Sequence, residues 1–233
     1  MSYSGTVMEK VSKYPELSII DVQKIYRENF YNQPEQTFYQ VVSRMARKGE
    51  IQRLSKGIYC KPKKGRFGAV ISSEKDILEY YLGQDKNNGA VVGYQMYNRH
   101  GLTTQVSKTI ELYSNVISQE RKQLKNVSIR KAILRFDVST VKMIELLEVL
   151  QNYSNIEDLN RECMKIFIGA HIKYYDKRIL QELLERIGYK KSTLASLKNM
   201  LDFFKVDNDI VQYLRGTSTY KALRMEELSD TAQ

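Results

Sequence analysis

Hydrophobic residues recur at helical spacing in the first part of the chain. Val7, Val11 and Tyr14 are four and three residues apart, which predicts a short amphipathic helix over residues 6–14. A second short helix is predicted from Ser18, because Ser18 and Asp21 have the spacing of a capping box. Its apolar face would consist of Ile19, Val22, Ile25 and Tyr26.

The segment ENFYNQ, residues 28–33, interrupts this periodicity, and a third helix is predicted from Pro34, a residue typical of the first helical position. One side of this helix is an apolar stripe of Phe38, Val41, Val42 and Met45. The opposite side gathers Gln36, Gln40, Ser43 and Arg47, flanked by Tyr39 and Arg44. Gln and Arg can make bidentate hydrogen bonds to adenine and guanine edges in the major groove. This side is therefore either a DNA-reading face or an ordinary solvated one.

A β-hairpin is predicted directly after the third helix. Gly49 ends the helix, residues 51–54 alternate as a strand, residues 55–57 form a turn, and residues 58–60 return before Pro62 stops the pairing. Three helices followed by a hairpin are the order of a winged helix-turn-helix, in which the third helix enters the major groove. ENFYNQ is longer than the usual turn of such a motif, and a winged helix that contacts only protein is the alternative.

Positive charge is concentrated in this same region. The formal net charge is +10, and residues 1–66 contain 13 Lys plus Arg against 6 Asp plus Glu, so +7 of it lies there. Basic side chains along a hairpin can neutralise phosphates, which positions a protein on DNA without reading sequence. The predicted DNA-binding residues are Gln36, Thr37, Tyr39, Gln40, Ser43, Arg44, Arg47, Lys48, Arg53, Lys56, Lys61, Lys63, Lys64 and Arg66.

Two stretches carry a family resemblance. GEIQRLSKGIYCKPKKGRFG, residues 49–68, and GYQMYNRHGLTTQVSKTIELYSN, residues 93–115, resemble the AbiEi-type antitoxins of bacterial abortive-infection systems. The more distinctive part is residues 101–106, while Cys60 stands where a second aromatic residue is expected. The resemblance implies a repressor of its own operon that also counteracts a nucleotidyltransferase-like toxin. In such type IV systems the antitoxin acts without a stable toxin complex.

A second domain is predicted over residues 67–233, after a linker KKGRFG at residues 63–68. A helix over residues 74–82 and strands over residues 109–113 and 128–136 predict a small sheet within residues 67–138. Val141, Ile144, Leu147 and Leu150 begin a helical portion over residues 139–233. The fold class is thus α+β: an N-terminal winged helix-turn-helix followed by a mixed α/β, helix-rich C-terminal domain.

Catalytic motifs do not favour an enzyme. The chain contains no Gly-Ser dipeptide of the nucleotidyltransferase type and no Walker loop, and Asp207 and Asp209 are interpreted as a helix start. The charged run at residues 120–122 is interpreted as a solvated loop rather than part of a nuclease. We therefore expect a protein that is not an enzyme. Basic residues of the C-terminal half are either solvated or contact nucleic acid, a nucleotide or the DNA flanking the site: Lys173, Lys177, Arg178, Lys190, Lys191 and Lys198.

The remaining candidates point to structural roles. Cys60 and Cys163 are far apart and are interpreted as buried hydrophobes, and His100 and His171 are interpreted as isolated structural residues, so no metal or cofactor is expected. No membrane partner is expected, because apolar runs are short and the N-terminus lacks a secretory signal, which predicts a cytoplasmic protein. The leading hypothesis is that the protein binds double-stranded DNA at its own promoter. The alternative is a non-enzymatic binding module whose C-terminal domain recognises RNA or protein.

Overall fold

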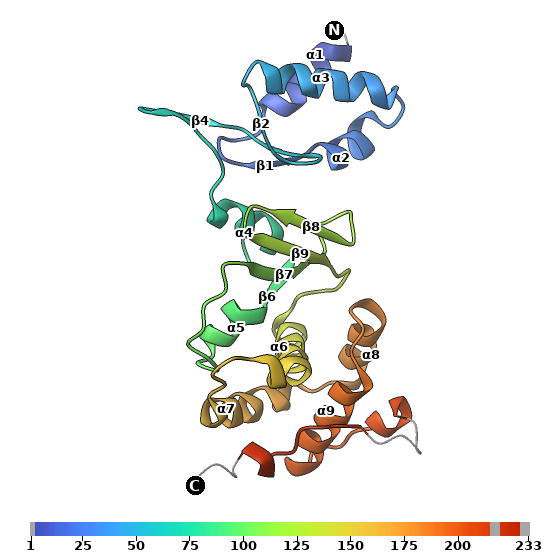
Figure 1. Ribbon diagram of the computed structural model, residues 1–233. Coiled ribbons are helices and arrows are strands. Elements are labelled where there is room, and N and C mark those ends of the chain that lie inside the picture. Colours follow the sequence, from blue (N-terminus) through green and yellow to red (C-terminus); the bar gives the residue numbers. More distant parts are fainter. Residues whose placement is uncertain (1–2, 215–219, 229–233) are drawn as a thin grey trace.

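The chain contains both helices and strands, as expected for an α+β fold, with the strands lying between Ile19 and Lys131 and helices following in the rest of the described residues. The computed structural model describes residues 3–214 and 220–228. In Figure 1, N-terminal helices with a small sheet lie at one end, a second sheet lies in the middle, and the C-terminal helices lie at the other end. Across the described ranges, no helix is both long enough and apolar enough to cross a membrane.

The N-terminal part places three helical segments over a three-stranded antiparallel sheet of order β1-β3-β2. Its elements are α1 (Tyr3–Ser12), β1 (Ile19–Asp21), α2 (Val22–Ile25), a π-helix η1 (Tyr26–Phe30), α3 (Glu35–Arg47), β2 (Gln52–Ser55) and β3 (Ile58–Cys60). The apolar stripes predicted for the first and third helices meet in one core: Val7 and Val11 of α1 pack with Phe38, Val41 and Val42 of α3. The hairpin predicted over residues 51–60 is confirmed.

The predicted second helix is wrong in its first turn. Ile19–Asp21 form strand β1, which pairs with β3 so that Ile19 faces Cys60 and Asp21 faces Ile58. The helix begins at Val22, and the carboxylate of Asp21 accepts hydrogen bonds from the backbone N–H groups of Gln23 and Lys24, both at 3.0 Å. Two successive isoleucines favour a strand wherever a partner is available, and β3 supplies one from nearly forty residues later. The helix continues as η1 through Phe30, so the first half of ENFYNQ is helical and residues 31–33 lie outside the helix.

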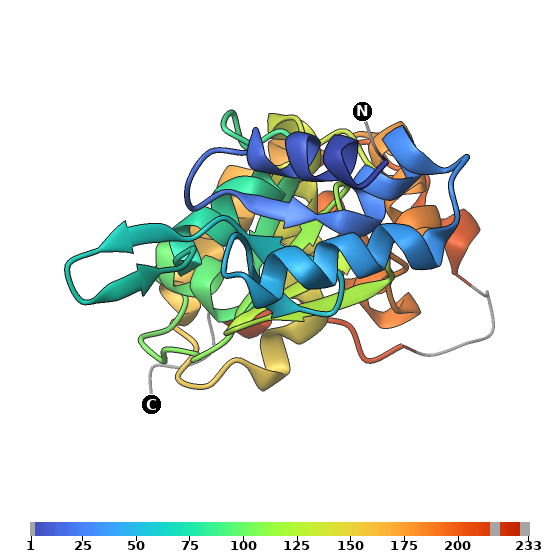
Figure 2. The ribbon, with the colours of Figure 1, turned by 90° about the horizontal axis from the view of Figure 1, so that it is seen from above.

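The predicted linker contains a second hairpin. Strands β4 (Lys63–Gly65) and β5 (Gly68–Val70) pair antiparallel, with Lys63 opposite Val70. The predicted domain boundary at Arg66 falls in the turn between these strands. Both views show this hairpin projecting from the body of the molecule (Figures 1 and 2).

The central sheet has four strands in the order β6-β7-β9-β8, with β7 and β9 parallel and the other pairs antiparallel. Its elements are α4 (Glu74–Leu82), β6 (Gly89–Val92), α5 (Gly93–Arg99), β7 (Ile110–Ser114), β8 (Arg121–Leu124) and β9 (Val127–Lys131). Two strands were predicted near their observed places, although the second ends at Lys131 rather than at residue 136. The charged run at residues 120–122 is a loop only at Glu120, because Arg121 and Lys122 begin strand β8, in which Lys122 and Leu124 are buried while Arg121 and Gln123 are exposed.

The helical portion packs around α6 (Val138–Asn152), which is buried along most of its length. The other helices are α7 (Arg161–His171), α8 (Lys177–Arg186) and α9 (Lys191–Phe203). Ile144, Leu147 and Leu150 of the predicted stripe are buried in the same core as Leu180 of α8 and Leu197 of α9.

A third apolar cluster joins the N-terminal sheet to the central one. Ile19 and Ile58 pack in it with Ile77 of α4, Leu112 of β7 and Ile129 of β9. All five are almost fully buried. The N-terminal sheet is therefore covered by helices on one face and by the central sheet with α4 on the other.

Candidate nucleic-acid interface

Helix α3 presents a polar face at one end of the molecule. Phe38, Val41, Val42 and Met45 are buried, as the sequence predicted. The opposite side chains are exposed: Gln36, Gln40, Ser43, Arg44, Arg47 and Lys48. Figure 2, which looks onto this end, shows α3 and α1 lying side by side above the strands. A helix whose outward face offers amide and guanidinium groups can enter a major groove without unfolding anything.

An aromatic cluster fixes α3 against the preceding segment. The ring of Phe38 lies 5.5 Å from that of Phe30 and 5.3 Å from those of Tyr26 and Tyr39, measured between centroids. Tyr39 is therefore half-buried, and burial raises the pKa of its hydroxyl. Thr37 is half-buried as well. These two predicted DNA-binding residues are less available to a ligand than their exposed neighbours.

The hairpin lysines differ in what they contact. Lys56 lies exposed in the turn between β2 and β3, and Arg53 is exposed with its Nε donating to the carbonyl oxygen of Ser55 at 3.3 Å. Lys61 is half-buried, and its Nζ donates to the carbonyl oxygen of Ser12 at 2.5 Å. Its own carbonyl accepts from the N–H of Leu17 at 2.7 Å. Lys61 thus ties the end of β3 to α1, whereas Lys56 is open to a phosphate.

The basic residues predicted in the C-terminal half differ in what they contact. Lys177 lies 3.4 Å from Asp207 and 4.0 Å from Asp209, Lys198 pairs with Asp202, and Lys191 donates to the carbonyl oxygen of Tyr213. Lys173, Arg178 and Lys190 are exposed. Three of the six are therefore held by partners within the chain, which leaves their contact with nucleic acid a prediction.

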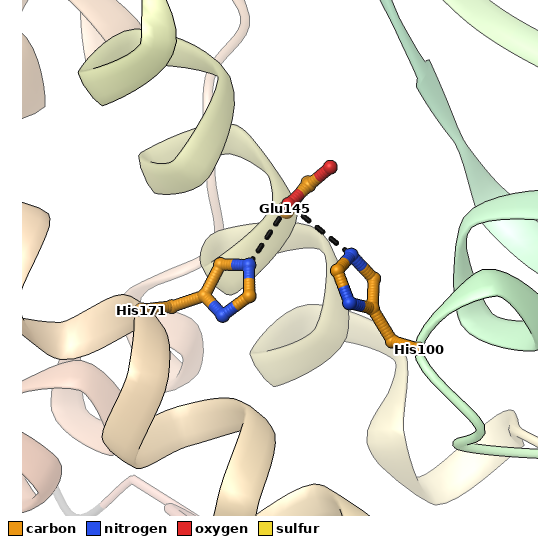
Figure 3. A group of neighbouring side chains, drawn as sticks. All are labelled: His100, Glu145 and His171. Atoms are coloured by element: carbon orange, nitrogen blue, oxygen red, sulfur yellow. Dashed lines mark hydrogen bonds and ion pairs between the residues drawn. The ribbon is translucent and has the colours of Figure 1, made fainter.

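The two histidines predicted to be isolated lie together. Figure 3 shows His100, at the end of α5, and His171, at the end of α7, both directed at Glu145 of α6. The Nε2 atom of His171 is 2.8 Å from Oε2 of Glu145, and that of His100 is 3.3 Å from the same oxygen. Glu145 and His171 are buried. One feature of the sequence could have indicated buried charge here: Glu145 and Glu148 interrupt the otherwise apolar run MIELLEVL at residues 143–150.

Two cationic side chains, of Arg99 and Lys142, contact the same carboxylate as the two histidines. Arg99 lies 2.5 Å from Oε1 of Glu145, and Nζ of Lys142 lies 2.9 Å from Oε2. Burial pushes the pKa of Glu145 upward, but the contacts with His100, His171 and Lys142 outweigh it, so the pKa lies well below its usual range. The carboxylate is therefore ionised and compensated inside the core.

The His–Glu–His group has donor atoms of the kinds that hold a transition metal, all within 4.8 Å of one another. The surrounding charge argues against such an ion. Lys142 already lies 3.4 Å from Nε2 of His171 as well as against Glu145, and Arg99 occupies the other oxygen. A divalent cation would add its charge beside two cations that share a single carboxylate. These residues fit an ion-pair cluster that joins α5, α6 and α7 better than a metal centre.

A polar hollow lies between the central sheet and α6. Its lining includes Glu111 and Arg130 of the sheet, Tyr94 of α5 and Glu148 of α6, and its volume is about 360 Å³. The guanidinium of Arg130 stacks 4.6 Å from the ring centroid of Tyr113 and lies 3.3 Å from Glu111. Buried Glu148 accepts a 2.8 Å hydrogen bond from the hydroxyl of Tyr113. No local pattern in the sequence indicates this hollow, because its residues come from separate elements.

Comparison with known proteins places this chain in a protein family of unknown function. A family model described as "Family of unknown function (DUF6088)" matches residues 7–150. No curated protein matches the chain. Among solved structures, the chain is similar to the crystal structure of the RV2827C protein from Mycobacterium tuberculosis, with 10% sequence identity and a TM-score of 0.38. That similarity covers 84% of this chain and 75% of the other, and at this level it carries no inference about function.

Proposed function

We propose that this chain, which belongs to the DUF6088 family, is a DNA-binding repressor of its own operon whose N-terminal part is a winged helix-turn-helix. The observation that carries the proposal is the outward face of α3. Gln36, Gln40 and Arg47 are exposed on the side opposite the buried Phe38 and Val42. Their side chains match the hydrogen-bonding pattern of purine edges.

The arrangement around α3 supports this proposal. The order α1, β1, α2 with η1, α3, β2 and β3, with the sheet order β1-β3-β2, suits a winged helix-turn-helix in which α3 is the reading helix. Exposed Arg44 and Lys48 flank the reading face, and exposed Arg53 and Lys56 follow on the hairpin. Such cations would contact phosphates on either side of the bases that α3 reads.

A gel shift tests the DNA-binding proposal. The full chain is incubated with the duplex immediately upstream of its own operon and a large excess of nonspecific competitor. A discrete complex that persists with competitor supports the proposal. Loss of the complex at all competitor levels, with retained binding of RNA or a protein partner, would favour the alternative binding module.

We further propose that the protein counteracts a nucleotidyltransferase-like toxin encoded beside it, without chemistry of its own and without a stable complex. This part rests on the resemblance of residues 49–68 and 93–115 to AbiEi-type antitoxins. Expressing the neighbouring gene with and without this chain tests it by cell growth. If the two roles are separate, a variant that no longer binds DNA still rescues growth, and failure of the intact chain to rescue would refute the antitoxin role.

A further inference from the structure

The β4–β5 hairpin has the features of an interaction element rather than of a structural one. Every residue from Lys63 to Val70 is exposed, and the hairpin extends away from the body in both views (Figures 1 and 2). Three residues per strand at about 3.3 Å each give a reach of about 10 Å. An isolated two-stranded hairpin adds little to folding stability, so the fold itself does not account for it.

An aromatic ring lies at the apex of this hairpin. The exposure of Phe67 is 102% of its reference value, so it has the solvent contact of a residue in an extended peptide. Gly68, with φ of +118°, completes the turn beside it in a backbone conformation that other residues rarely adopt. Burying a phenylalanine ring removes a large apolar surface from water, which favours binding. A fully exposed ring on a projecting turn is thus well placed to be buried by a partner.

The charge around this ring limits what the partner can be. Lys63, Lys64 and Arg66 are exposed on the hairpin, and no acidic residue occurs between Glu50 and Glu74. The hairpin therefore presents three positive charges together with one aromatic ring. A matching partner is a polyanion that has apolar faces within reach of its charges, which describes the stacked bases and phosphates of a nucleic acid.

We propose that the β4–β5 hairpin is a second DNA-contacting element, which enters the minor groove beside the site read by α3. Arg66 lies in the groove, Phe67 inserts at a base step, and Lys63 and Lys64 contact the flanking phosphates. Arginine favours narrow minor grooves, and apolar side chains that insert between base pairs unstack and bend the duplex. This inference rests on the proposed DNA-binding function and adds an unstacked base step and a bend to it.

The test uses the full chain and an operator duplex that carries 2-aminopurine along the flank of the α3 site and a fluorescence donor and acceptor at its ends. Wild-type protein is expected to raise 2-aminopurine emission at one step and to shorten the end-to-end distance. Phe67→Ala is expected to abolish both signals and to weaken binding roughly 5- to 100-fold, the range of losses found when an aromatic–base stack is removed. Val106→Ala, which alters an exposed apolar residue elsewhere, is the matched control and keeps all three values.

The outcomes separate this inference from the function on which it rests. Specific binding by wild type with no change in Phe67→Ala overturns the hairpin inference and leaves the repressor proposal intact. Absence of specific binding by wild type refutes both. A wild-type dimer that Phe67→Ala converts to a monomer, measured by sedimentation without DNA, would assign the hairpin to self-association and overturn the inference. Because Phe67 contacts solvent, unchanged circular dichroism and melting temperature are expected for the variant.

Discussion

Glu145 and Glu148 lie about one turn apart on α6, both buried, and their pKa values are shifted in opposite directions. Burial pushes both upward, and it prevails at Glu148, so the pKa of that carboxyl is raised. At Glu145 the contacts with His100, His171 and Lys142 outweigh burial, and its pKa is lowered. The same helix thus carries one carboxylate that favours ionisation and one that resists it. Each makes a distinct prediction about stability and pH.

Replacing Glu145 with Gln is expected to destabilise the fold at neutral pH. The side chains of Arg99 and Lys142 are 54% and 29% exposed, so the charges left behind are partly solvated, and the cost is that of losing charge-assisted hydrogen bonds, about 1.5–3 kcal/mol. Because the folded pKa of Glu145 is lowered, its contribution is complete above the ordinary pKa of 4.5 and is lost as pH falls below it. Urea unfolding of wild type should therefore show a loss of stability in acid that the variant lacks.

The matched control for this measurement is Glu162→Gln. Glu162 is exposed on α7 and pairs with Lys165, and such surface pairs contribute about 0–1 kcal/mol. If Glu145→Gln had the same free energy of unfolding as the control and lost stability in acid as wild type does, the result would contradict an ionised Glu145 in this cluster.

Replacing Glu148 with Gln is expected to leave the free energy of unfolding at neutral pH unchanged or to raise it, the opposite of the effect at Glu145. An amide oxygen can still accept the hydrogen bond from the Tyr113 hydroxyl, and the cost of ionising a buried carboxyl disappears. Because the folded pKa of Glu148 is raised, the native state holds this proton more tightly than the unfolded chain. Wild type therefore loses stability as pH rises from 4.5 through the folded pKa.

The variant should accordingly match or exceed wild type in unfolding free energy at neutral pH, and its advantage should shrink in acid. Glu120→Gln, at an exposed position, serves as the control and is expected to change neither value beyond about 0.5 kcal/mol. A Glu148→Gln protein that is less stable at neutral pH would mean that the ionised carboxylate is needed in the hollow, for example by Arg130.

Local periodicity explains which parts of the fold were predictable. The stripe of α3 follows from spacing alone, because Phe38, Val41, Val42 and Met45 share one side of any helix. Ile19 and Ile20 have no such signal, since a strand of three residues is decided by the partner it finds in β3. The alternation along β8 lies in burial and not in the sequence, because RKQL has Leu124 as its one apolar residue and the other buried position is occupied by Lys122.

Local sequence patterns could not indicate contacts between residues that are far apart in the chain. His100 and His171 are 71 positions apart, and only the packing of α5 and α7 on α6 brings both to Glu145. The predicted cut at Arg66 would separate Ile19 and Ile58 from the central residues that bury them, such as Ile77 and Leu112. A short N-terminal fragment would expose that apolar surface, which no local pattern indicates.

Base reading by α3 predicts a loss of discrimination in two variants. Gln40→Ala and Arg47→Ala should each cost about 1–3 kcal/mol at the contacted base pair and relax preference there. Both side chains are exposed, so folding should be unaffected. Titrations of operator and scrambled duplexes give the ratio of specific to nonspecific affinity for each variant. Gln181→Ala and Arg186→Ala, at exposed positions of α8, are the matched controls, and wild-type ratios in both α3 variants would exclude α3 as the reading helix.

Lys56 and Lys61 provide the sharpest test of which hairpin lysine contacts phosphate. Lys56 lies exposed in a turn that is fixed to the start of α2, because the carbonyl of Gly57 accepts from the N–H of Val22 at 3.1 Å. Each neutralised phosphate adds about 0.9 to the slope of log affinity against log salt. Lys56→Ala should therefore weaken specific and nonspecific binding alike and reduce that slope by about 1.

Lys61→Ala should leave the salt slope near the wild-type value, because the ammonium is already bound to the carbonyl oxygen of Ser12. Its effect should instead be a loss of folding stability of about 1 kcal/mol, the size of one hydrogen bond. Titrations at three salt concentrations together with urea unfolding distinguish the two lysines. Equal reductions in slope would mean that Lys61 leaves Ser12 to reach the DNA backbone. An unchanged slope in both variants would remove these two lysines from the interface and leave phosphate contact to Arg53, to α3 and to the β4–β5 hairpin.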